Sequence, residues 1–311
     1  MSFHSGFVSI LGRPNAGKST LLNALVGQKL AIVTPKPQTT RNRILGIVNV
    51  AGGKGTPPGQ IVLIDTPGVH KPDTPLNRKM MQEVHDALAG RDLILLIVDA
   101  TAEFGRGDQF VLDLVRRGGG PVFLLLNKID RIEKSKLLPL IDRYRQLHDF
   151  AEVIPISALK REGLDELLAC VIRALPEGPR YFPKDQVTDQ PERFLAAEIV
   201  REKVVLATEQ EVPYATTVLI DKYEELPKLT RIYATIYCER DGQKKILIGK
   251  GGAMLKKIGT DARRELERIL GTKVYLELFV KVQPGWRESR RFLEEQDWRR
   301  QLGHMEGGEE T

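Results

Sequence analysis

Short, nearly continuous runs of Val, Ile, Leu and Phe recur along the first half of the chain and alternate with amphipathic segments. These runs cover residues 7–11, 61–64, 93–98, 122–126 and 153–156. A helix-like segment, Lys18 to Val26, follows the first run. Strands that are apolar on both faces are typical of parallel sheets with helices on both sides. The sequence therefore predicts an α/β domain with a doubly wound, mostly parallel sheet.

A glycine-rich loop joins the first run to the first helix-like segment. It reads GRPNAGKS, from Gly12 to Ser19, and fits the pattern GxxxxGK[ST]. In such a loop, backbone N–H groups and the helix N-terminus surround phosphate oxygens, and the lysine, here Lys18, reaches the β and γ phosphates. The hydroxyl of Ser19 is a ligand for Mg²⁺. The pattern predicts a nucleotide phosphate site.

Three further polar motifs each follow an apolar run, in the order DTPG (Asp65 to Gly68), NKID (Asn127 to Asp130) and SAL (Ser157 to Leu159). An acid at position 65 can hold a magnesium-bound water, and a backbone N–H beside it can reach the γ phosphate. The carboxylate of Asp130 can accept two hydrogen bonds from guanine, whereas adenine offers no matching donors. Together the motifs predict a site for GTP and GDP at the carboxyl ends of the strands.

Near the other end of the chain, ILIGKGGAMLKK places the loop Gly249 to Gly252 between two segments of helical periodicity. The loop lacks a preceding buried strand and a GK[ST] ending, so it is not a second phosphate loop of this kind. Residues 242–291 contain 13 Lys and Arg against 5 Asp and Glu, a surplus of +8 where the whole chain carries +6. This concentration of positive charge predicts a polyanionic partner.

The GxxG turn between two short helices resembles that of a type II KH domain, which implies binding of single-stranded RNA. Four expected regions follow from this organisation: a GTP-binding domain (1–178), a proline-rich linker (179–192), an α+β RNA-binding domain (193–300) and a disordered tail (301–311). Two isolated cysteines, and the lack of any apolar run long enough to span a bilayer, lead us to expect a cytoplasmic protein.

The motif series GRPNAGKST, PQTTR, DTPG, NKID, SAL and IGKGG resembles that of the Era family of P-loop GTPases. The resemblance implies a GTPase of small-subunit ribosome assembly that binds 16S rRNA near its 3′ end. It assigns catalytic positions to Lys18, Thr40 and Gly68. It assigns Mg²⁺ ligands to Ser19, Thr40 and Asp65. Nucleotide contacts are expected from Gly12, Asn15, Ala16, Gly17, Lys18, Ser19, Thr20, Asp65, Gly68, Asn127, Lys128, Asp130, Ser157, Ala158 and Leu159. RNA contacts are expected from Ile248, Gly249, Lys250, Gly251, Gly252, Lys256, Lys257, Arg290 and Arg291.

Several alternatives stay open at the level of sequence. Thr40 in the loop 33–43 is the first candidate for the metal, with Thr39 in reserve, and Asn15 is a candidate ligand of K⁺. Because Val69 follows DTPG where signalling GTPases carry a water-orienting glutamine, we expect slow intrinsic hydrolysis. The alternative function is an RNA-binding assembly scaffold with structural nucleotide and negligible hydrolysis. We expect a monomer, no DNA binding, and at most weak peripheral association with a membrane.

Overall fold

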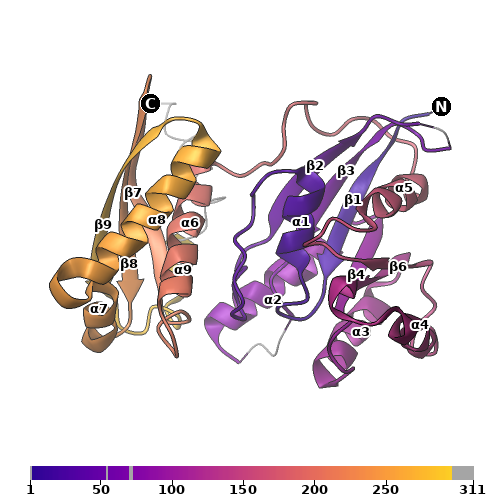
Figure 1. Ribbon diagram of the computed structural model, residues 1–311, viewed down its shortest axis with the longest axis horizontal. Helices are drawn as coiled ribbons and strands as arrows, with labels where there is room; N and C mark the ends of the chain where they lie inside the picture. Colours follow the sequence, from indigo (N-terminus) through magenta and orange to yellow (C-terminus); the bar gives the residue numbers. More distant parts are fainter. Residues whose placement is uncertain (1, 54, 70–72, 296–311) are drawn as a thin grey trace. The chain divides into compact units, whose positions relative to one another are not determined.

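The computed structural model describes residues 2–53, 55–69 and 73–295 (Figure 1). The chain forms two compact units, the first from residues 1–71 and 79–189 and the second from residues 72–78 and 190–311. The predicted tail, 301–311, lies outside the described residues.

The first unit is built on a six-stranded sheet in the order β2-β3-β1-β4-β5-β6. Its strands are β1 (His4–Leu11), β2 (Ile44–Val50), β3 (Gly59–Asp65), β4 (Leu93–Asp99), β5 (Val122–Asn127) and β6 (Glu152–Ile156). All neighbours pair in parallel except β2, which forms an antiparallel hairpin with β3. The prediction of a mostly parallel sheet is confirmed. All four polar motifs of the sequence follow strands of this sheet, at the carboxyl ends of β1, β3, β5 and β6.

Helices cover both faces of this sheet because alternate strand residues point to opposite sides. One apolar core joins the sheet to helices α1 (Lys18–Val26) and α5 (Leu164–Ala174). The core on the other face includes residues of α2 (Pro75–Leu88), α3 (Arg106–Gly118) and α4 (Leu137–Arg145). This double covering explains why β4 and β5 read as unbroken apolar runs.

The segment 176–190, which includes most of the predicted linker (179–192), contains no helix or strand but is tied along the first sheet. Ile47 N–H in the edge strand β2 donates to the carbonyl of Val187 at 2.8 Å, and the hydroxyl of Thr188 donates to the carbonyl of Leu45 at 2.6 Å. The buried amide of Gln60 in β3 contacts the backbone of Tyr181 and Phe182. We call this segment the strap.

The second unit has a three-stranded sheet in the order β7-β8-β9, in which β7 and β8 pair antiparallel and β8 and β9 pair in parallel. Its elements are α6 (Glu192–Ala207), β7 (Thr217–Leu226), β8 (Leu229–Cys238), α7 (Asp241–Ile248), η3 (Lys250–Gly252), α8 (Ala253–Leu270), β9 (Lys273–Val282) and α9 (Arg290–Glu295). One apolar core joins α6, α7 and α8 to one face of the sheet. In the described residues, no helix has the length and apolar character needed to cross a membrane.

Candidate nucleotide site and nucleic-acid groove

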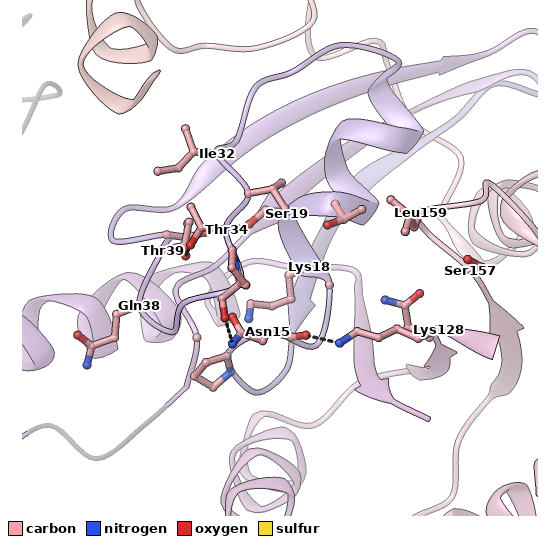
Figure 2. A pocket seen from close by; sticks show the side chains of 18 of the residues that line it. Asn15, Lys18, Ser19, Ile32, Thr34, Gln38, Thr39, Lys128, Ser157 and Leu159 are labelled. Atoms are coloured by element: carbon pink, nitrogen blue, oxygen red, sulfur yellow. Dashed lines mark hydrogen bonds between the residues drawn. The ribbon is translucent and has the colours of Figure 1, made fainter. Parts of the chain in front are cut away.

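The glycine-rich loop forms the floor of a pocket of about 490 Å³ at the carboxyl ends of the strands (Figure 2). Two of its glycines are required by close contacts. A Cβ atom on Gly12 would lie 2.4 Å from the carbonyl oxygen of Ile97, and one on Gly17 would lie 2.2 Å from Nδ2 of Asn127. Gly17 also has a φ of 103°, which side chains rarely adopt. The loop is therefore shaped to leave its backbone N–H groups available for an anion.

Lys18 begins helix α1 and is almost completely buried. Its Nζ donates to the carbonyls of Gly12 and Arg13 at 3.2 and 3.0 Å. Burial lowers the pKa of Lys18 to about 8, although Asp65 opposes this shift. Burial likewise raises the pKa of Asp65 to about 6, opposed by Lys18. Both pKa shifts favour the neutral form of the side chain, because each charged form is buried with too little opposite charge around it. A bound anion would stabilise charged Lys18, and a bound cation would stabilise charged Asp65.

The predicted magnesium ligands meet at one point. Ser19 Oγ donates to Asp65 Oδ2 at 2.7 Å and lies 2.8 Å from Thr40 Oγ1. Asp65 Oδ1 is buried and has no hydrogen-bond partner among the described residues. Two hydroxyls and a carboxylate form a hard oxygen set of the kind Mg²⁺ prefers. These residues fit the ion. Thr39 instead places its hydroxyl 2.7 Å from that of Thr34, within its own loop.

The segment after β3 approaches the phosphate loop closely. A Cβ atom on Gly68 would lie 2.8 Å from Cγ of Pro14, so this position accepts only glycine without rearrangement. The next residue, Val69, is 3% exposed and packs in the core with Leu11 and Val84. Its side chain is thus buried in apolar surroundings and cannot orient a water molecule.

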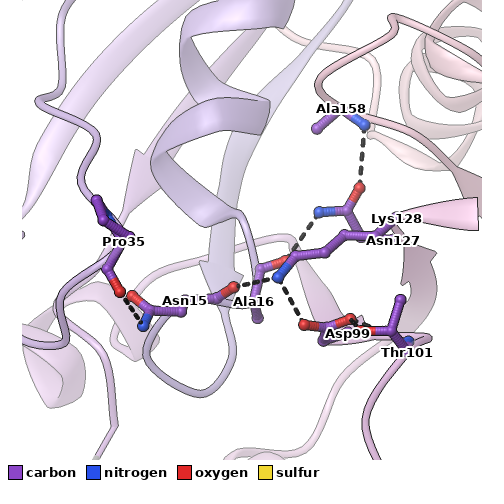
Figure 3. A network of polar contacts seen from close by, with 8 residues as sticks. All are labelled: Asn15, Ala16, Pro35, Asp99, Thr101, Asn127, Lys128 and Ala158. Atoms are coloured by element: carbon purple, nitrogen blue, oxygen red, sulfur yellow. Dashed lines mark hydrogen bonds and ion pairs between the residues drawn. The ribbon is translucent and has the colours of Figure 1, made fainter. Parts of the chain in front are cut away.

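The base end of the pocket is held by Asn127, which lies at the end of β5 (Figure 3). Its Nδ2 donates to the carbonyl of Ala16 at 2.8 Å, and its Oδ1 accepts from the N–H of Ala158 at 3.0 Å. One buried side chain therefore joins the phosphate loop to the SAL loop. In this geometry Asn127 positions the two loops that surround the nucleotide.

Asp130 lines the pocket and is oriented by the neighbouring loop. Its Oδ1 accepts a hydrogen bond from the hydroxyl of Ser157 at 2.6 Å, and that hydroxyl also accepts from the N–H of Lys160 at 3.1 Å. The second carboxylate oxygen is available for the base. Leu159, 73% exposed, lines the same end of the pocket.

The structure adds Asp99, a residue that the sequence reading missed. Lys128 Nζ donates to the carbonyl of Asn15 at 2.9 Å and contacts Asp99 Oδ2 at 2.5 Å (Figure 3). Burial alone would raise the pKa of Asp99, but hydrogen bonds from Lys128 and Thr101 outweigh it and leave the pKa below its ordinary value. The sequence contains a signal for Asp99, because this residue follows an apolar run as the other motifs do. Asn15 donates its Nδ2 to the carbonyl of Pro35 at 2.9 Å.

In the second unit, the loop Gly249 to Gly252 joins α7 to α8 and has positive φ at three positions, 72° at Gly249, 58° at Gly251 and 81° at Gly252. A groove of about 420 Å³ begins at Gly252 and runs between α8 and β9. It is lined by Gly252, Leu255, Lys256, Gly259, Thr260, Arg263, Leu276, Glu277 and Leu278. An apolar floor with cationic side chains suits unpaired bases with a phosphate backbone.

The predicted RNA contacts divide into those at this groove and those away from it. Lys256 lines it, whereas Lys257 is exposed outside its lining. Arg290 lies in α9 and pairs with Glu294 at 2.9 Å, and Arg291 is exposed on the same helix. The sequence reading missed Arg263, although its spacing of seven residues from Lys256 places both on one helix face.

Comparison with known proteins finds a matching family model for each of the two units. A family model described as "50S ribosome-binding GTPase" matches residues 7–128, and one described as "KH domain" matches residues 211–287. The GTPase Era of Syntrophus aciditrophicus is 51% identical over 94% of this chain and 94% of its own length. The GTPase Era of Geobacter metallireducens is 52% identical over 94% of this chain and 97% of its own length.

Solved structures agree with this assignment. Era of Aquifex aeolicus, as a single-residue variant bound to GDP·AlF₄⁻, superimposes with a TM-score of 0.89 at 42% identity. A structure of Era in complex with MgGDPNP and nucleotides 1506–1542 of 16S ribosomal RNA gives the same TM-score and identity. Each comparison covers 94% of this chain and 98% of the other. The chain therefore belongs to the Era family of GTPases, with an N-terminal GTPase domain and a C-terminal KH domain.

Proposed function

We propose that this GTPase binds single-stranded RNA near the 3′ end of 16S rRNA through its GxxG groove and acts in assembly of the small ribosomal subunit. The observation that carries the proposal is that one chain holds both a phosphate-loop pocket and a cationic groove at a GxxG turn. A related Era protein, solved with MgGDPNP and 16S rRNA nucleotides, supports the identity of both ligands. Because rRNA is the proposed partner, we propose that the protein acts in the cytoplasm. We also propose that it acts as a monomer.

In the proposed reaction, GTP lies along the pocket with its phosphates over the glycine-rich loop and its base against Asp130. Lys18 places its positive charge at the β and γ phosphates, where negative charge develops in the transition state. Ser19, Thr40 and Asp65 would hold Mg²⁺, and the bound ion would supply positive charge that neutralises the phosphates. The N–H of Gly68, held against Pro14, is the proposed donor to the γ phosphate.

The loop 33–43 is the proposed switch because it contributes Thr40 to the metal site. Contact of Thr40 with the metal orders this loop in the GTP form, and loss of the γ phosphate removes that restraint. Thr40→Ala is therefore expected to lower single-turnover GTP hydrolysis by about 100-fold or more, the size of one transition-state contact. Thr39→Ala is the matched control, since Thr39 bonds within its own loop. Equal hydrolysis by the two variants would exclude this role.

Potassium is a further proposed ligand beside the phosphates. Asn15 Nδ2 donates to the carbonyl oxygen of Pro35 (Figure 3), so the side chain of Asn15 lies beside one carbonyl oxygen and would have to turn its own Oδ1 toward a cation. Turnover faster in KCl than in NaCl, with the difference abolished in Asn15→Ala, is the expected result. Equal turnover in the two salts would remove the proposal.

Nucleotide state is proposed to control RNA affinity. The test measures binding of a single-stranded RNA, taken from the 3′ region of 16S rRNA, to the GTP-analogue and GDP forms of the full chain. By reciprocity, an RNA that binds one form more tightly must strengthen binding of that nucleotide by the same factor. Identical RNA affinities would exclude the coupling. Single-turnover hydrolysis with and without RNA separates this function from a scaffold that only stores nucleotide.

A further inference from the structure

The face of the three-stranded sheet opposite its helices carries exposed aromatic side chains. Alternate residues of β9 pack into the apolar core of the unit: Val274, Leu276, Leu278 and Val280. The intervening Tyr275 and Phe279 therefore point to the other face, where they are 47% and 45% exposed. Tyr233 of β8 is half-buried beside Tyr275, with ring centroids 5.9 Å apart. We call Tyr233, Tyr275 and Phe279 the aromatic patch.

Helix α9 covers a different part of the same sheet. Phe292 of α9 packs against Tyr237 with ring centroids 5.1 Å apart, and against the fully buried Trp286 at 6.2 Å. Among the described residues, no such packing is recorded for Phe279, and Tyr275 contacts only its neighbours in the sheet. Exposed apolar side chains that lie together on one face are candidates for a binding surface, whereas single exposed side chains need no such explanation.

The charges around the aromatic patch favour an anionic partner. Arg231, Lys273 and Lys281 are exposed at β8 and β9, and within the described chain no ion pair is recorded for them. Arg231 pairs in register with Tyr275, and Lys281 lies two residues beyond Phe279. Each of the three nearby acids has a partner, although among the described residues only Glu224 is paired with a cation, and the basic side chains still outnumber the acids on this face. Thr235 donates to Asp221 at 2.7 Å, Tyr275 donates to Glu277 at 2.9 Å, and Lys222 pairs with Glu224 at 2.7 Å.

The aromatic patch is also continuous with the GxxG groove. Strand β9 is an edge of the sheet, and its residues Leu276 and Leu278 line the groove on the helix side. Tyr275 and Phe279 lie on the opposite side of that same strand. A nucleic-acid strand that leaves the groove thus needs only to cross one strand edge to reach the rings.

We propose that the aromatic patch is a second RNA subsite, a stacking surface for bases that flank those held in the GxxG groove. This inference rests on the proposed RNA-binding function. Aromatic rings stack on any base, so the subsite would add affinity with little sequence preference. Tyr275 and Phe279 are four residues apart, about 13 Å along the strand, so each ring can take a separate base.

The test uses the full chain and two fluorescein-labelled RNAs, one of about four nucleotides, the number a KH loop clamps, and one of about twelve. The double variant Tyr275→Ala/Phe279→Ala is expected to weaken binding of the long RNA at least about tenfold and leave the short RNA unchanged. Phe279→Trp should retain binding because tryptophan also stacks. Leu226→Ala is the control, since Leu226 is similarly exposed, at 42%, outside the aromatic patch.

Unchanged affinity of the double variant for the long RNA would overturn the stacking surface and leave the groove intact. Equal weakening for both RNAs would also overturn it, because the effect would not depend on flanking bases. If the parent protein bound neither RNA, the proposed RNA-binding function itself would fail, and this inference with it.

Discussion

Gln60 holds the backbone of Phe182 by both of its polar groups. Its Oε1 accepts the N–H of Phe182 at 2.9 Å while its Nε2 donates to the carbonyl of the same residue at 2.9 Å. Gln60 is fully buried in β3, and its Oε1 also accepts the N–H of Tyr181 at 2.9 Å. A single amide thus fixes the strap to the strand that ends at Asp65, the proposed metal ligand. The strap is consequently part of the GTPase unit's own structure.

Replacement of Gln60 by alanine is expected to release the strap. Two N–H groups and one carbonyl lose their partner in a partly buried place, at about 1–3 kcal/mol for each group that water cannot reach. We expect a free energy of unfolding lower by about 3 kcal/mol and faster trypsin cleavage after Arg180 or Lys184. Urea unfolding and limited proteolysis measure these effects. Gln109→Ala, on the surface helix α3, is the control, and equal behaviour of both variants would contradict the expectation.

A glutamine at position 69 should not accelerate hydrolysis. The side chain of Val69 is 3% exposed and packs in an apolar core, so Val69→Gln would bury an amide without an established partner. We expect loss of about 1–3 kcal/mol in unfolding free energy and no gain in the single-turnover hydrolysis rate. A variant that stayed as stable as the parent and hydrolysed GTP faster would show that this side chain can turn toward the nucleotide.

The sequence predicts a functional residue when that residue belongs to a motif with a recognisable local spacing. Ser19, Asp65 and Asp130 could be predicted because each belongs to a motif that follows a strand, and parallel strands bring their carboxyl ends to one edge of the sheet. Asp99 obeys the same rule but stands alone, and its role appears only once Lys128 is seen between it and Asn15. The strap was beyond reach, because its contacts join residues more than 120 positions apart through Gln60, with no periodicity to mark them.

Asp99→Asn is expected to speed release of GDP. The change removes the charge that holds Lys128 against the carbonyl of Asn15, and for a partly exposed pair we expect about a three- to tenfold faster rate. Stopped-flow release of a fluorescent GDP analogue measures it. Asp113→Asn, which alters a surface acid paired with Arg116 at 3.3 Å, is the control. Equal release rates for Asp99→Asn and the parent would exclude a role for the pair.

The pH dependence of that difference follows from the sign of the Asp99 shift. Because its pKa in the folded protein lies below the ordinary 3.8, the pair contributes fully above that value and is lost only as pH falls through the lower folded value. The ratio of release rates between Asp99→Asn and the parent should thus be constant from about pH 6 to 9, well above the titration. A ratio that varied across this range would point to another group.

Asp130→Asn should shift the base preference from guanine to xanthine. The asparagine oxygen can still accept a hydrogen bond from Ser157. Its NH₂ group then faces the N–H donors of guanine, with which it cannot form a hydrogen bond. Xanthine instead offers a carbonyl oxygen at this edge, which can accept from the NH₂ group. We expect GTP affinity to fall by about 100-fold or more and XTP affinity to rise. Competition against a fluorescent nucleotide measures both. Ser157→Ala should weaken GTP less, and parallel losses for GTP and XTP in Asp130→Asn would refute base reading by this residue.

Two adjacent lysines offer a matched test of the GxxG groove. Lys256 lines the groove, and Lys257, also exposed and at the next position of α8, does not. A lysine that contacts phosphate releases a counterion, so Lys256→Ala should reduce the slope of log affinity against log salt by about 0.7 for single-stranded RNA. At moderate salt this corresponds to a loss of about three- to tenfold in affinity. Lys257→Ala should change neither quantity, although it removes the same charge from the same helix. Fluorescence anisotropy at several KCl concentrations measures both variants. Equal slopes for the two would mean that general charge, and no specific contact in the groove, attracts the RNA.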